Sequence, residues 1–453
     1  MCDVTCNDDG RIVKMEVDYS STVDEKIPLT ESLALQGKLD EALDQLLALE
    51  KQTRTGADTH STSRILVHIV KLCFQAKKLD KLNEMIVILS KRRSQMKQAI
   101  QKMVQECCGY VDKLENSDKL NLIDTLRTVT AGKIYVEVER ARLTYKLSQI
   151  KESSGDIEGA ATLMQELQVE TFGSMEKREK VELILEQMRL CLARKDFIRT
   201  AIIAKKISVK FFDNAEQQDL KLKYYELMIT LGEHDSKYLD VSRYFLAIYN
   251  TKKVQEDIPK RNFVIQAALL FCILAPYDNE QHDLLHRLNQ DKVLKELLKF
   301  NQLLQLFITP ELIVWAGIFK EYEKELRAST VFNSEARFGD LKKRVVEHNM
   351  RVMAKYYTRI RLERMSQLLD LSMAETEQTL SNLVASKVVY AKVDRLSNIV
   401  HFVRQQKDPE QVLNDWSHNV NSLMKLLSRT THLINKEEMV HRHLQPVAIS
   451  SHD

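Results

Sequence analysis

The end of the chain contains the side-chain pattern that comes nearest to a metal site. His441 and His443 are separated by one residue, and Ser450 or Ser451 and then Asp453 follow. This order nearly reproduces the His-x-His…Ser-x-x-Asp arrangement of a class of zinc metalloproteases, but the spacing is wrong by one residue. Zinc ligands also need a rigid surrounding shell, which the last residues of a chain rarely supply. We therefore assign no metal ligands.

The rest of the sequence offers no recognised catalytic or cofactor motif. It has no glycine-rich phosphate loop, His-Glu-x-x-His, Gly-x-Ser-x-Gly or Cys-x-x-Cys. The seven cysteines are scattered, and Cys73, Cys191 and Cys272 fall within apolar helical patterns, as expected of buried, reduced thiols. No signal-peptide pattern or long apolar run is present. We predict no enzyme activity, catalytic residue, cofactor or membrane span, and a location in the cytoplasm and nucleus.

The stretch from Tyr356 to Val403 is where a helical apolar period gives way to the alternation typical of strands. Two β-branched runs, 388–393 and 399–403, flank a predicted turn. Ahead of them the order is helix, short strand, helix, turn and helix. This succession predicts a winged helix, although two apolar runs could also simply end a helical array.

The last helix of this unit has a clear start signal. Ser372 and Glu375 have capping-box spacing, so the helix should begin at Met373. Its predicted buried face consists of Leu380, Leu383 and Val384.

Winged helices serve both nucleic-acid readers and protein assemblies, so the charge on this helix matters. Residues 373–386 include Glu375 and Glu377 and no lysine or arginine, and these carboxylates would repel phosphates. The hairpin adds only Lys387, Lys392 and Arg395. The whole chain is balanced, with a net charge of +3 from 67 basic and 64 acidic residues. Protein assembly is favoured, and a nucleic-acid-binding module stays the alternative.

Helical patterns fill the chain from residue 28 to about 300, and their turns repeat. Aspartates mark these turns at Asp40, Asp80, Asp156, Asp196 and Asp235, separated by 40, 76, 40 and 39 residues. One degenerate copy is expected around 117–119. Each helical hairpin hides only part of its apolar face, so neighbours must stack, and the aspartate should cap the second helix. Only 11 glycines and 6 prolines are present, which also favours helices. The prediction is a mainly α protein with a right-handed, TPR-like helical-repeat solenoid.

Lys91, Arg92 and Arg93 form the most basic local cluster of this array, with Arg54, Arg64, Lys97 and Lys102 near in sequence. The cluster could contact an acidic partner, or it could be a solvated helix end.

The C-terminal part predicts a long amphipathic helix that begins after Pro409. Its apolar residues fall three, four or seven apart, which places them in one stripe. They are Val412, Leu413, Trp416, Val420, Leu423, Leu427 and Ile434. A helix beyond a finished domain has little of its own chain to pack on, so we expect a bundle with partner helices. Folding back on the same chain is the alternative.

These patterns give the following predicted organisation. A flexible N-terminal tail covers 1–25, the solenoid 26–328, a linker 329–340, the winged helix 341–406, the C-terminal amphipathic helix 407–445 and a tail 446–453.

Eight segments spread along the chain carry a resemblance to a known family. They are 10–20, 49–55, 90–95, 166–171, 344–349, 353–360, 391–396 and 413–417. With the layout of helical array, winged helix and terminal helix, they make the chain similar to the PCI family. Members of this family are scaffold subunits of the proteasome lid, the signalosome and translation initiation factor three. The segments 1–9, 329–338 and 444–453 depart from the resemblance and carry no inference.

The resemblance, strongest to the proteasome-lid members, implies a non-catalytic scaffold in a hetero-oligomer. It implies three kinds of partner: other PCI subunits of the lid, the deubiquitinating metalloprotease subunit that the lid positions, and the ATPase base. It also implies a role in ATP-dependent degradation of ubiquitinated proteins, with a signalosome or initiation-factor subunit as the alternative. The predicted assembly residues are Val389, Tyr390, Val393, Val400, Phe402, Leu413, Trp416, Val420, Leu423 and Leu427.

Overall fold

The computed structural model describes residues 18–114, 116–402 and 409–441, which form helices and one small sheet. They divide into two compact units, Met1–Ala268 and Leu269–Asp453. The division falls inside a helix rather than at the linker expected at 329–340. Among the described residues, no helix combines the length and apolar character needed to cross a membrane.

Unit 1 consists of helix pairs joined by tight turns. The pairs are α1 (Ser20–Leu35) with α2 (Leu39–Thr55), α3 (Thr59–Gln75) with α4 (Leu79–Lys91), α5 (Lys97–Val111) with α6 (Asn116–Thr130), α7 (Glu137–Ser153) with α8 (Ile157–Gln165), α9 (Lys177–Ala193) with α10 (Phe197–Ala204), and α11 (Gln218–His234) with α12 (Tyr238–Tyr249). Short 3-10 turns lie between some pairs at η1 (Ile134–Val136), η2 (Val169–Thr171), η3 (Val209–Asp213) and η4 (Ala215–Gln217). The helices α13 (Lys252–Glu256) and α14 (Ile258–Leu274) follow.

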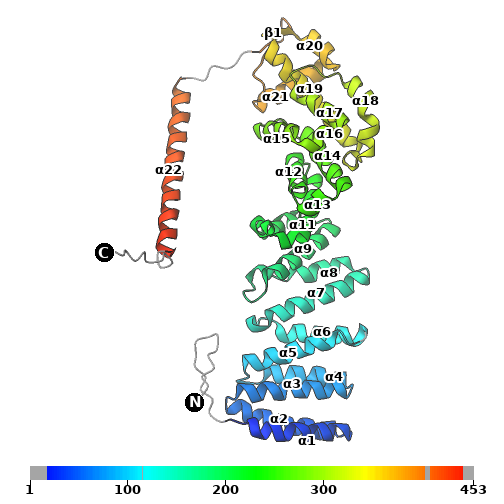
Figure 1. Ribbon diagram of the computed structural model, residues 1–453, viewed down its shortest axis with the longest axis vertical. Helices are drawn as coiled ribbons and strands as arrows, with labels where there is room; N and C mark the ends of the chain where they lie inside the picture. The colour runs from blue at the N-terminus through cyan, green and yellow to red at the C-terminus, as the bar shows by residue number, and fades with distance from the viewer. Residues whose placement is uncertain (1–17, 115, 403–408, 442–453) are drawn as a thin grey trace, which may run out of the picture. The chain divides into compact units, whose positions relative to one another are not determined.

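Each pair packs on the next. The first helices of successive pairs touch, as in α1 on α3, α3 on α5, α5 on α7 and α9 on α11. Figure 1 shows the same succession within unit 1, from blue α1 to green α12. Because each hairpin buries its apolar face between neighbours, one buried apolar cluster extends from Val23 in α1 to Leu147 in α7. Its largest fully buried side chains include Leu46, Leu49, Ile65, Leu66, Ile69, Leu82, Ile86 and Leu89. This is the predicted helical-repeat solenoid.

The repeat seen in the sequence is a repeated helix ending. At five turns a residue with positive φ follows the first helix, and the next amide N–H returns to a carbonyl five residues back. The positive-φ residues are Gly37, Lys77, Gly155, Lys195 and Ser236, with φ of 86°, 53°, 89°, 64° and 55°. The returning bonds are Lys38 N to Leu33 O, Lys78 N to Cys73 O, Asp156 N to Lys151 O, Asp196 N to Cys191 O and Lys237 N to Gly232 O, at 2.9–3.3 Å. This is the Schellman pattern, which satisfies carbonyls that the helix leaves free.

The predicted aspartate caps are confirmed at two turns and wrong at three. The carboxylates of Asp156 and Asp196 accept bonds from Gly159 N at 2.8 Å and Arg199 N at 3.2 Å. By contrast, Asp40 and Asp80 lie inside the first turn of their helices, and Asp235 ends α11. An acidic side chain in the first turn still complements the helix dipole, which explains why aspartate recurs there without capping.

The solenoid begins earlier than predicted, and its degenerate repeat is present. The helix α1 begins at Ser20, inside the segment 1–25 expected to be a tail, and Val23 is fully buried. The predicted tail is too long, because polar and acidic residues surround Val23 in the sequence and its burial is not evident from the pattern. The degenerate repeat is the pair α5 and α6, and the expected residues 117–119 lie in the first turns of α6.

Unit 2 contains the remaining helices and the sheet. Its helices are α15 (Asn279–Gln290), α16 (Lys292–Glu296), α17 (Leu298–Ile308), α18 (Trp315–Ala328), α19 (Glu335–Tyr356), α20 (Leu362–Leu369), α21 (Met373–Ala385) and α22 (Pro409–His441), with the 3-10 turn η5 (Thr330–Phe332). Its strands are β1 (Arg359–Arg361), β2 (Lys392–Asp394) and β3 (Ile399–His401).

The segment 329–340, expected to be a linker, is ordered and packed. Val331 and Phe332 are buried, and Ser334 caps α19 by accepting a bond from Ala336 N at 3.3 Å. Polar residues dominate this segment, so its apolar anchors did not stand out in the sequence.

The helix α19 is fixed to the chain that precedes α18. The Asn349 side chain accepts a bond from Ile313 N and donates one to Ile313 O, both at 2.8 Å. His348 Nε2 lies 3.1 Å from Glu311 O. A buried amide that pairs with both polar groups of one residue satisfies them fully. The first helix of the winged helix is therefore anchored within unit 2.

Candidate assembly interface

The turn between α20 and α21 of the winged helix is fixed by the caps of the two helices. Ser372 Oγ accepts a bond from Glu375 N at 3.3 Å, and the Glu375 carboxylate accepts one from Ser372 N at 3.1 Å. The capping box is thus complete, and α21 starts at Met373 as predicted. The preceding helix α20 ends at Asp370, which has a left-handed backbone with φ of 55°. These two ends set the turn between α20 and α21.

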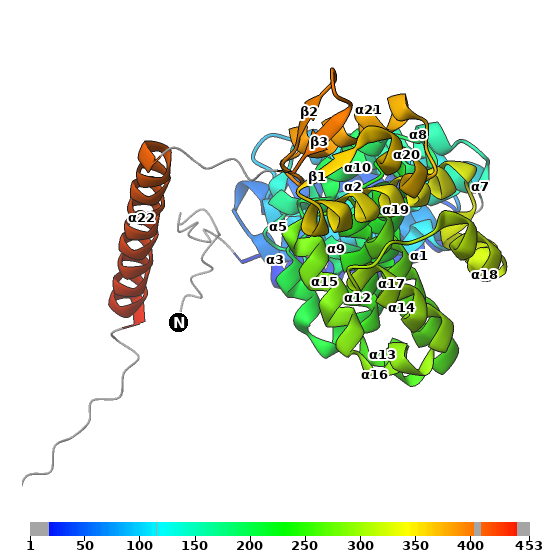
Figure 2. The ribbon, with the colours of Figure 1, turned by 90° about the horizontal axis from the view of Figure 1, so that it is seen from above.

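The sheet has the order β1-β3-β2, with antiparallel pairing throughout. Val400 at its centre lies opposite Ile360 on one side and Val393 on the other. Figure 2 shows the three strands beside α20 and α21. The topology of helix, strand, two helices and hairpin is that of the predicted winged helix.

The first hairpin strand is shorter than the predicted run 388–393. Only Lys392–Asp394 pairs with β3. Upstream, Lys387 has a φ of 61°, and the amides of Val388 and Val389 both return to Leu383 O, at 3.0 and 3.3 Å. These residues therefore end α21 in the same way that the solenoid helices end, so they are not available for strand pairing.

Several predicted assembly residues lie in the core of this domain. Val389, Val400 and Phe402 are buried, at 3%, 0% and 9% exposed, and they pack with Ile360, Met365 and the α21 residues Leu380 and Leu383. Their side chains therefore hold the winged helix together. Val384, also expected in this core, is instead at the surface, 36% exposed. A role in assembly for Val389, Val400 and Phe402 stays a prediction. Because these side chains are buried, they would act indirectly, by supporting the strands.

The surface beside β2 is open. Among the described residues β2 pairs on one side only, with β3. A hollow of about 490 Å³ beside it has a mixed lining of apolar and polar side chains, which are Leu380, Val384, Ala391, Val393, Glu377, Ser381, Asp394 and Arg395. Tyr390, at the start of this edge, is 45% exposed. An unpaired strand edge with apolar side chains next to it can accept a further strand.

The tip of the hairpin presents a residue that the sequence argument missed. Leu396 is 100% exposed. Its turn is held by Asp394, whose carboxylate accepts bonds from Leu396 N at 3.0 Å and Ser397 Oγ at 2.6 Å. The Ser397 hydroxyl, followed by the amide, lowers the pKa of Asp394. In the sequence, a large apolar residue inside the polar turn 394–398 could have indicated this exposed position.

The charges of α21 and the hairpin are partly paired. Arg395 Nε donates to Glu377 at 2.8 Å, so one of the three hairpin cations is neutralised by the helix that would read a groove. Glu375 is occupied by the capping box. Both contacts leave this surface poorly suited to phosphate.

The helix α22 presents the remaining predicted residues to solvent. Every residue of α22 whose burial is described is exposed. The predicted stripe shows 61% exposure at Leu413, 67% at Trp416, 41% at Val420, 63% at Leu423 and 58% at Leu427. Their 3-4-3-4 spacing is that of a coiled-coil seam. An exposed apolar stripe of this length is typical of an interaction surface.

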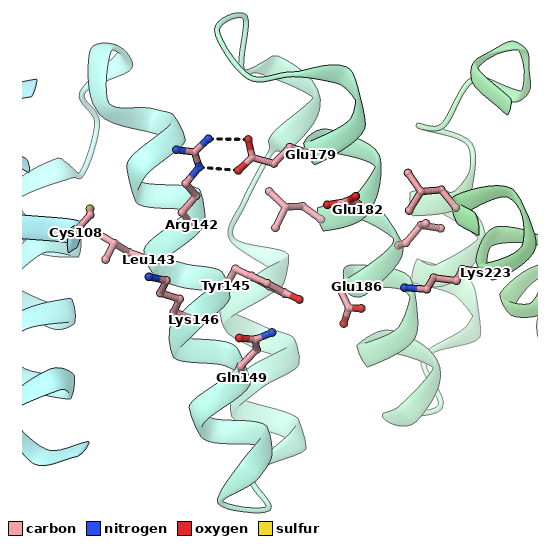
Figure 3. Close-up of a pocket in the computed structure, with 13 residues that line it drawn as sticks. Cys108, Arg142, Leu143, Tyr145, Lys146, Gln149, Glu179, Glu182, Glu186 and Lys223 are labelled. Atoms are coloured by element: carbon pink, nitrogen blue, oxygen red, sulfur yellow. Dashed lines mark hydrogen bonds and ion pairs between the residues drawn. The ribbon is translucent and has the colours of Figure 1, made fainter. Parts of the chain in front are cut away.

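A hollow of about 520 Å³ lies in unit 1, between α7, α9 and α11. Figure 3 shows Arg142 and Glu179 directed at each other, with Arg142 Nε and Nη2 at 2.7 and 3.0 Å from the two carboxylate oxygens. Lys146 Nζ pairs with Asp112 at 2.7 Å. Burial raises the pKa of the Cys108 thiol to about 11, so the reactive thiolate is scarce at neutral pH. The first ion pair joins α7 to α9, and the second joins α7 to the end of α5.

Only His441 of the C-terminal His-x-His…Ser-x-x-Asp pattern lies within the described residues. Within the described ranges no group of three or more His, Cys, Asp or Glu side chains could hold a metal. His441 Nε2 lies 3.2 Å from Glu437 on the same helix. The other members of the pattern, His443, Ser450, Ser451 and Asp453, lie outside the described residues.

Comparison with known proteins matches each part of this architecture. The family profile described as PSMD12/CSN4, N-terminal, covers residues 41–257, the PCI domain profile covers 310–404, and the 26S proteasome regulatory subunit RPN5 C-terminal domain covers 410–442. Solenoid, winged helix and terminal helix together define a PCI-domain protein. The chain belongs to the family of 26S proteasome non-ATPase regulatory subunit 12, also named RPN5.

This assignment is supported by relatives that are similar over nearly the full length of both chains. The 26S proteasome non-ATPase regulatory subunit 12 of Dictyostelium discoideum is 45% identical over 95% of this chain and 96% of its own length. The 26S proteasome regulatory subunit RPN5 of Saccharomyces cerevisiae is 42% identical over 95% and 98%. COP9 signalosome complex subunit 4 of Drosophila melanogaster is 22% identical over 67% and 74%. The proteasome relatives are therefore far more similar than this signalosome subunit.

Proposed function

We propose that this proteasome regulatory subunit is a non-catalytic scaffold of the lid. In this proposal the winged helix and α22 bind neighbouring subunits, and the solenoid is the arm they carry. The observation that supports it best is α22, with an apolar stripe from Leu413 to Leu427 in solvent. The match of the RPN5 C-terminal profile to 410–442 adds to it, because it coincides with this one helix.

The apolar face of α22 has no packing partner among the described residues. A single amphipathic helix gains little in water from propensity alone, and most helical stability comes from packing of the apolar face. By the helical repeat of 100° per residue, His418, Lys425 and Arg429 lie opposite the apolar stripe. This division into an apolar and a cationic face suits a helix that packs in a bundle with helices of other subunits.

The winged helix would contribute in a different way. Its open β2 edge offers backbone groups, and the adjacent hollow offers Val384 and Val393. A strand from a neighbouring PCI subunit would gain main-chain hydrogen bonds from the edge and side-chain contacts from the hollow. Leu396 at the tip and Tyr390 at the edge are exposed apolar residues that such a partner would cover.

The finer roles belong to the same proposal. The lid with this subunit would position a deubiquitinating metalloprotease subunit and contact the ATPase base, in support of ATP-dependent degradation of ubiquitinated proteins. The protein would reside in the cytoplasm and nucleus. Support comes from the names of the relatives, which are regulatory subunits of the 26S proteasome.

Affinity purification of the tagged full chain with quantitative mass spectrometry tests this function. We expect the other lid subunits in equal amounts to the tagged chain, with the ATPase base at low salt. Recovery of the signalosome or of initiation factor three in place of the lid would contradict the proposal. Steeply salt-dependent binding of the purified chain to DNA or RNA would instead support the nucleic-acid alternative.

A further inference from the structure

Four lysines converge on a pocket in unit 1. Lys177 and Lys180 come from the start of α9, and Lys206 and Lys210 come from the segment that follows α10. The pocket has a volume of about 490 Å³ and a single acidic lining residue, Glu170. Its lining therefore carries an excess of positive charge, although the chain as a whole is nearly neutral.

The floor of this pocket is apolar. Val181, Ile184 and Ile207 are buried with 8%, 4% and 6% exposure, and Phe211 is half-buried beside them. On α9 the lysines at 177 and 180 and the apolar residues at 181 and 184 are three or four apart, so they share one helix face. Cationic side chains thus surround an apolar surface.

The lysines have little acidic company within the described part of the chain. Glu170 pairs with Lys206 at 2.7 Å. No ion pair is found there for Lys177, Lys180 or Lys210, whereas other basic residues of the array, such as Arg142, are paired. Lysines in the first turns of a helix also oppose its dipole, so helix stability does not account for Lys177 and Lys180.

We propose that this pocket binds an acidic peptide segment that carries a bulky apolar side chain. Its carboxylates would contact the four lysines, and its apolar side chain would cover Ile184, Ile207 and Phe211. A small polyanion could use the lysines but would leave the apolar floor in water, so the combination favours a peptide. This inference does not depend on the lid assignment, because the site lies on the solenoid and uses none of the residues assigned to lid assembly.

Fluorescence anisotropy with the full chain tests the site. The probe is a fluorescein-labelled peptide of sequence Asp-Asp-Glu-Phe-Glu-Asp-Asp. We expect binding that weakens with salt and falls about tenfold in the double variant Lys180→Glu, Lys210→Glu, which removes two charge contacts. The matched control is Lys51→Glu, Lys252→Glu, which changes the net charge equally at exposed lysines elsewhere in unit 1. Circular dichroism verifies that both variants are folded.

Two further probes separate a peptide site from general polyanion binding. The peptide with serine in place of phenylalanine should bind several-fold more weakly, because it leaves the apolar floor uncovered. Inositol hexakisphosphate should compete only weakly. The proposal is overturned by an absence of binding, by equal losses in the two double variants, by equal affinity of the two peptides, or by strong competition from inositol hexakisphosphate.

Discussion

Glu50 binds two arginines of the basic cluster around Lys91–Arg93. Its side chain is fully buried on α2, and it accepts bonds from Arg54 Nε and Gln95 Nε2, both at 3.1 Å, and from Arg92. Arg54 also donates to Arg93 O at 2.6 Å, which ties the end of α2 to the loop after α4. Two members of the basic cluster are therefore structural, because they neutralise a buried carboxylate.

Thermal and denaturant unfolding of single variants measures this arrangement. Glu50→Ala should lower the free energy of unfolding by about 3 kcal/mol, since it leaves two arginines without their buried partner. Arg92→Ala should cost less, because Arg54 still pairs with Glu50. Arg93→Ala, at an exposed side chain, should be nearly neutral. Equal effects of Arg92→Ala and Arg93→Ala would show that the buried pair does not carry the stability.

His348 gives the fold a pH dependence. Burial, and then Arg351, lower its pKa from 6.5 to about 4. Its Nδ1 is buried without a partner, so a proton there would place an unpaired charge in the interior. Below pH 6.5 the unfolded chain binds this proton and the folded chain does not. Stability is thus complete above pH 6.5 and falls as the pH drops toward 4.

Unfolding as a function of pH, compared between the native chain and His348→Gln, checks this effect. Glutamine keeps a donor for Glu311 O and cannot titrate. The native chain should lose about 2 kcal/mol more than the variant between pH 6.5 and pH 5. Parallel curves for the two proteins would mean that His348 is protonated in the fold at pH 5.

At the scale of elements, the features that could be predicted from the sequence are those that depend on residues close together in the chain. The capping box at Ser372 and the alternation around Val400 involve neighbours in sequence, and both predicted the winged helix. The strand run at 388–393 was too long because Val388 and Val389 bond back to Leu383, a competition that alternation alone does not show. The buried contacts of Val331 and Phe332, which replace the expected linker, depend on distant partners. So does the lysine pocket, whose members lie in separate segments.

Substitutions in the hairpin test the assignment of its core. Val400→Asp places an uncompensated charge at a fully buried position and should cost several kcal/mol, about 3 or more, so the winged helix should unfold. Leu396→Asp, at the exposed hairpin tip, is the matched control and should leave stability unchanged. Limited proteolysis and circular dichroism distinguish them. A folded Val400→Asp domain that fails only in assembly would contradict the burial of Val400.

At the scale of the whole molecule, the chain combines a packed array with surfaces that its described residues leave uncovered. The solenoid repeats one helix ending at the turn between the two helices of a pair, and successive pairs pack on each other. The winged helix leaves β2 open, and α22 leaves an apolar stripe in solvent. Substitutions on α22 should therefore disturb assembly while the solenoid stays folded.

The most direct measurement is the incorporation of α22 variants into the lid, quantified on native gels with mass spectrometry. The variant Trp416→Ala, Val420→Ala, Leu423→Ala removes the centre of the apolar stripe, where a truncated aromatic anchor alone costs about 2 kcal/mol of binding. The control His418→Ala, Lys425→Ala, Arg429→Ala changes the opposite face of the same helix. The account predicts that the first variant stays folded but is excluded from the lid, while the control is incorporated normally. Normal incorporation of the first variant, or equal loss in both, would contradict it.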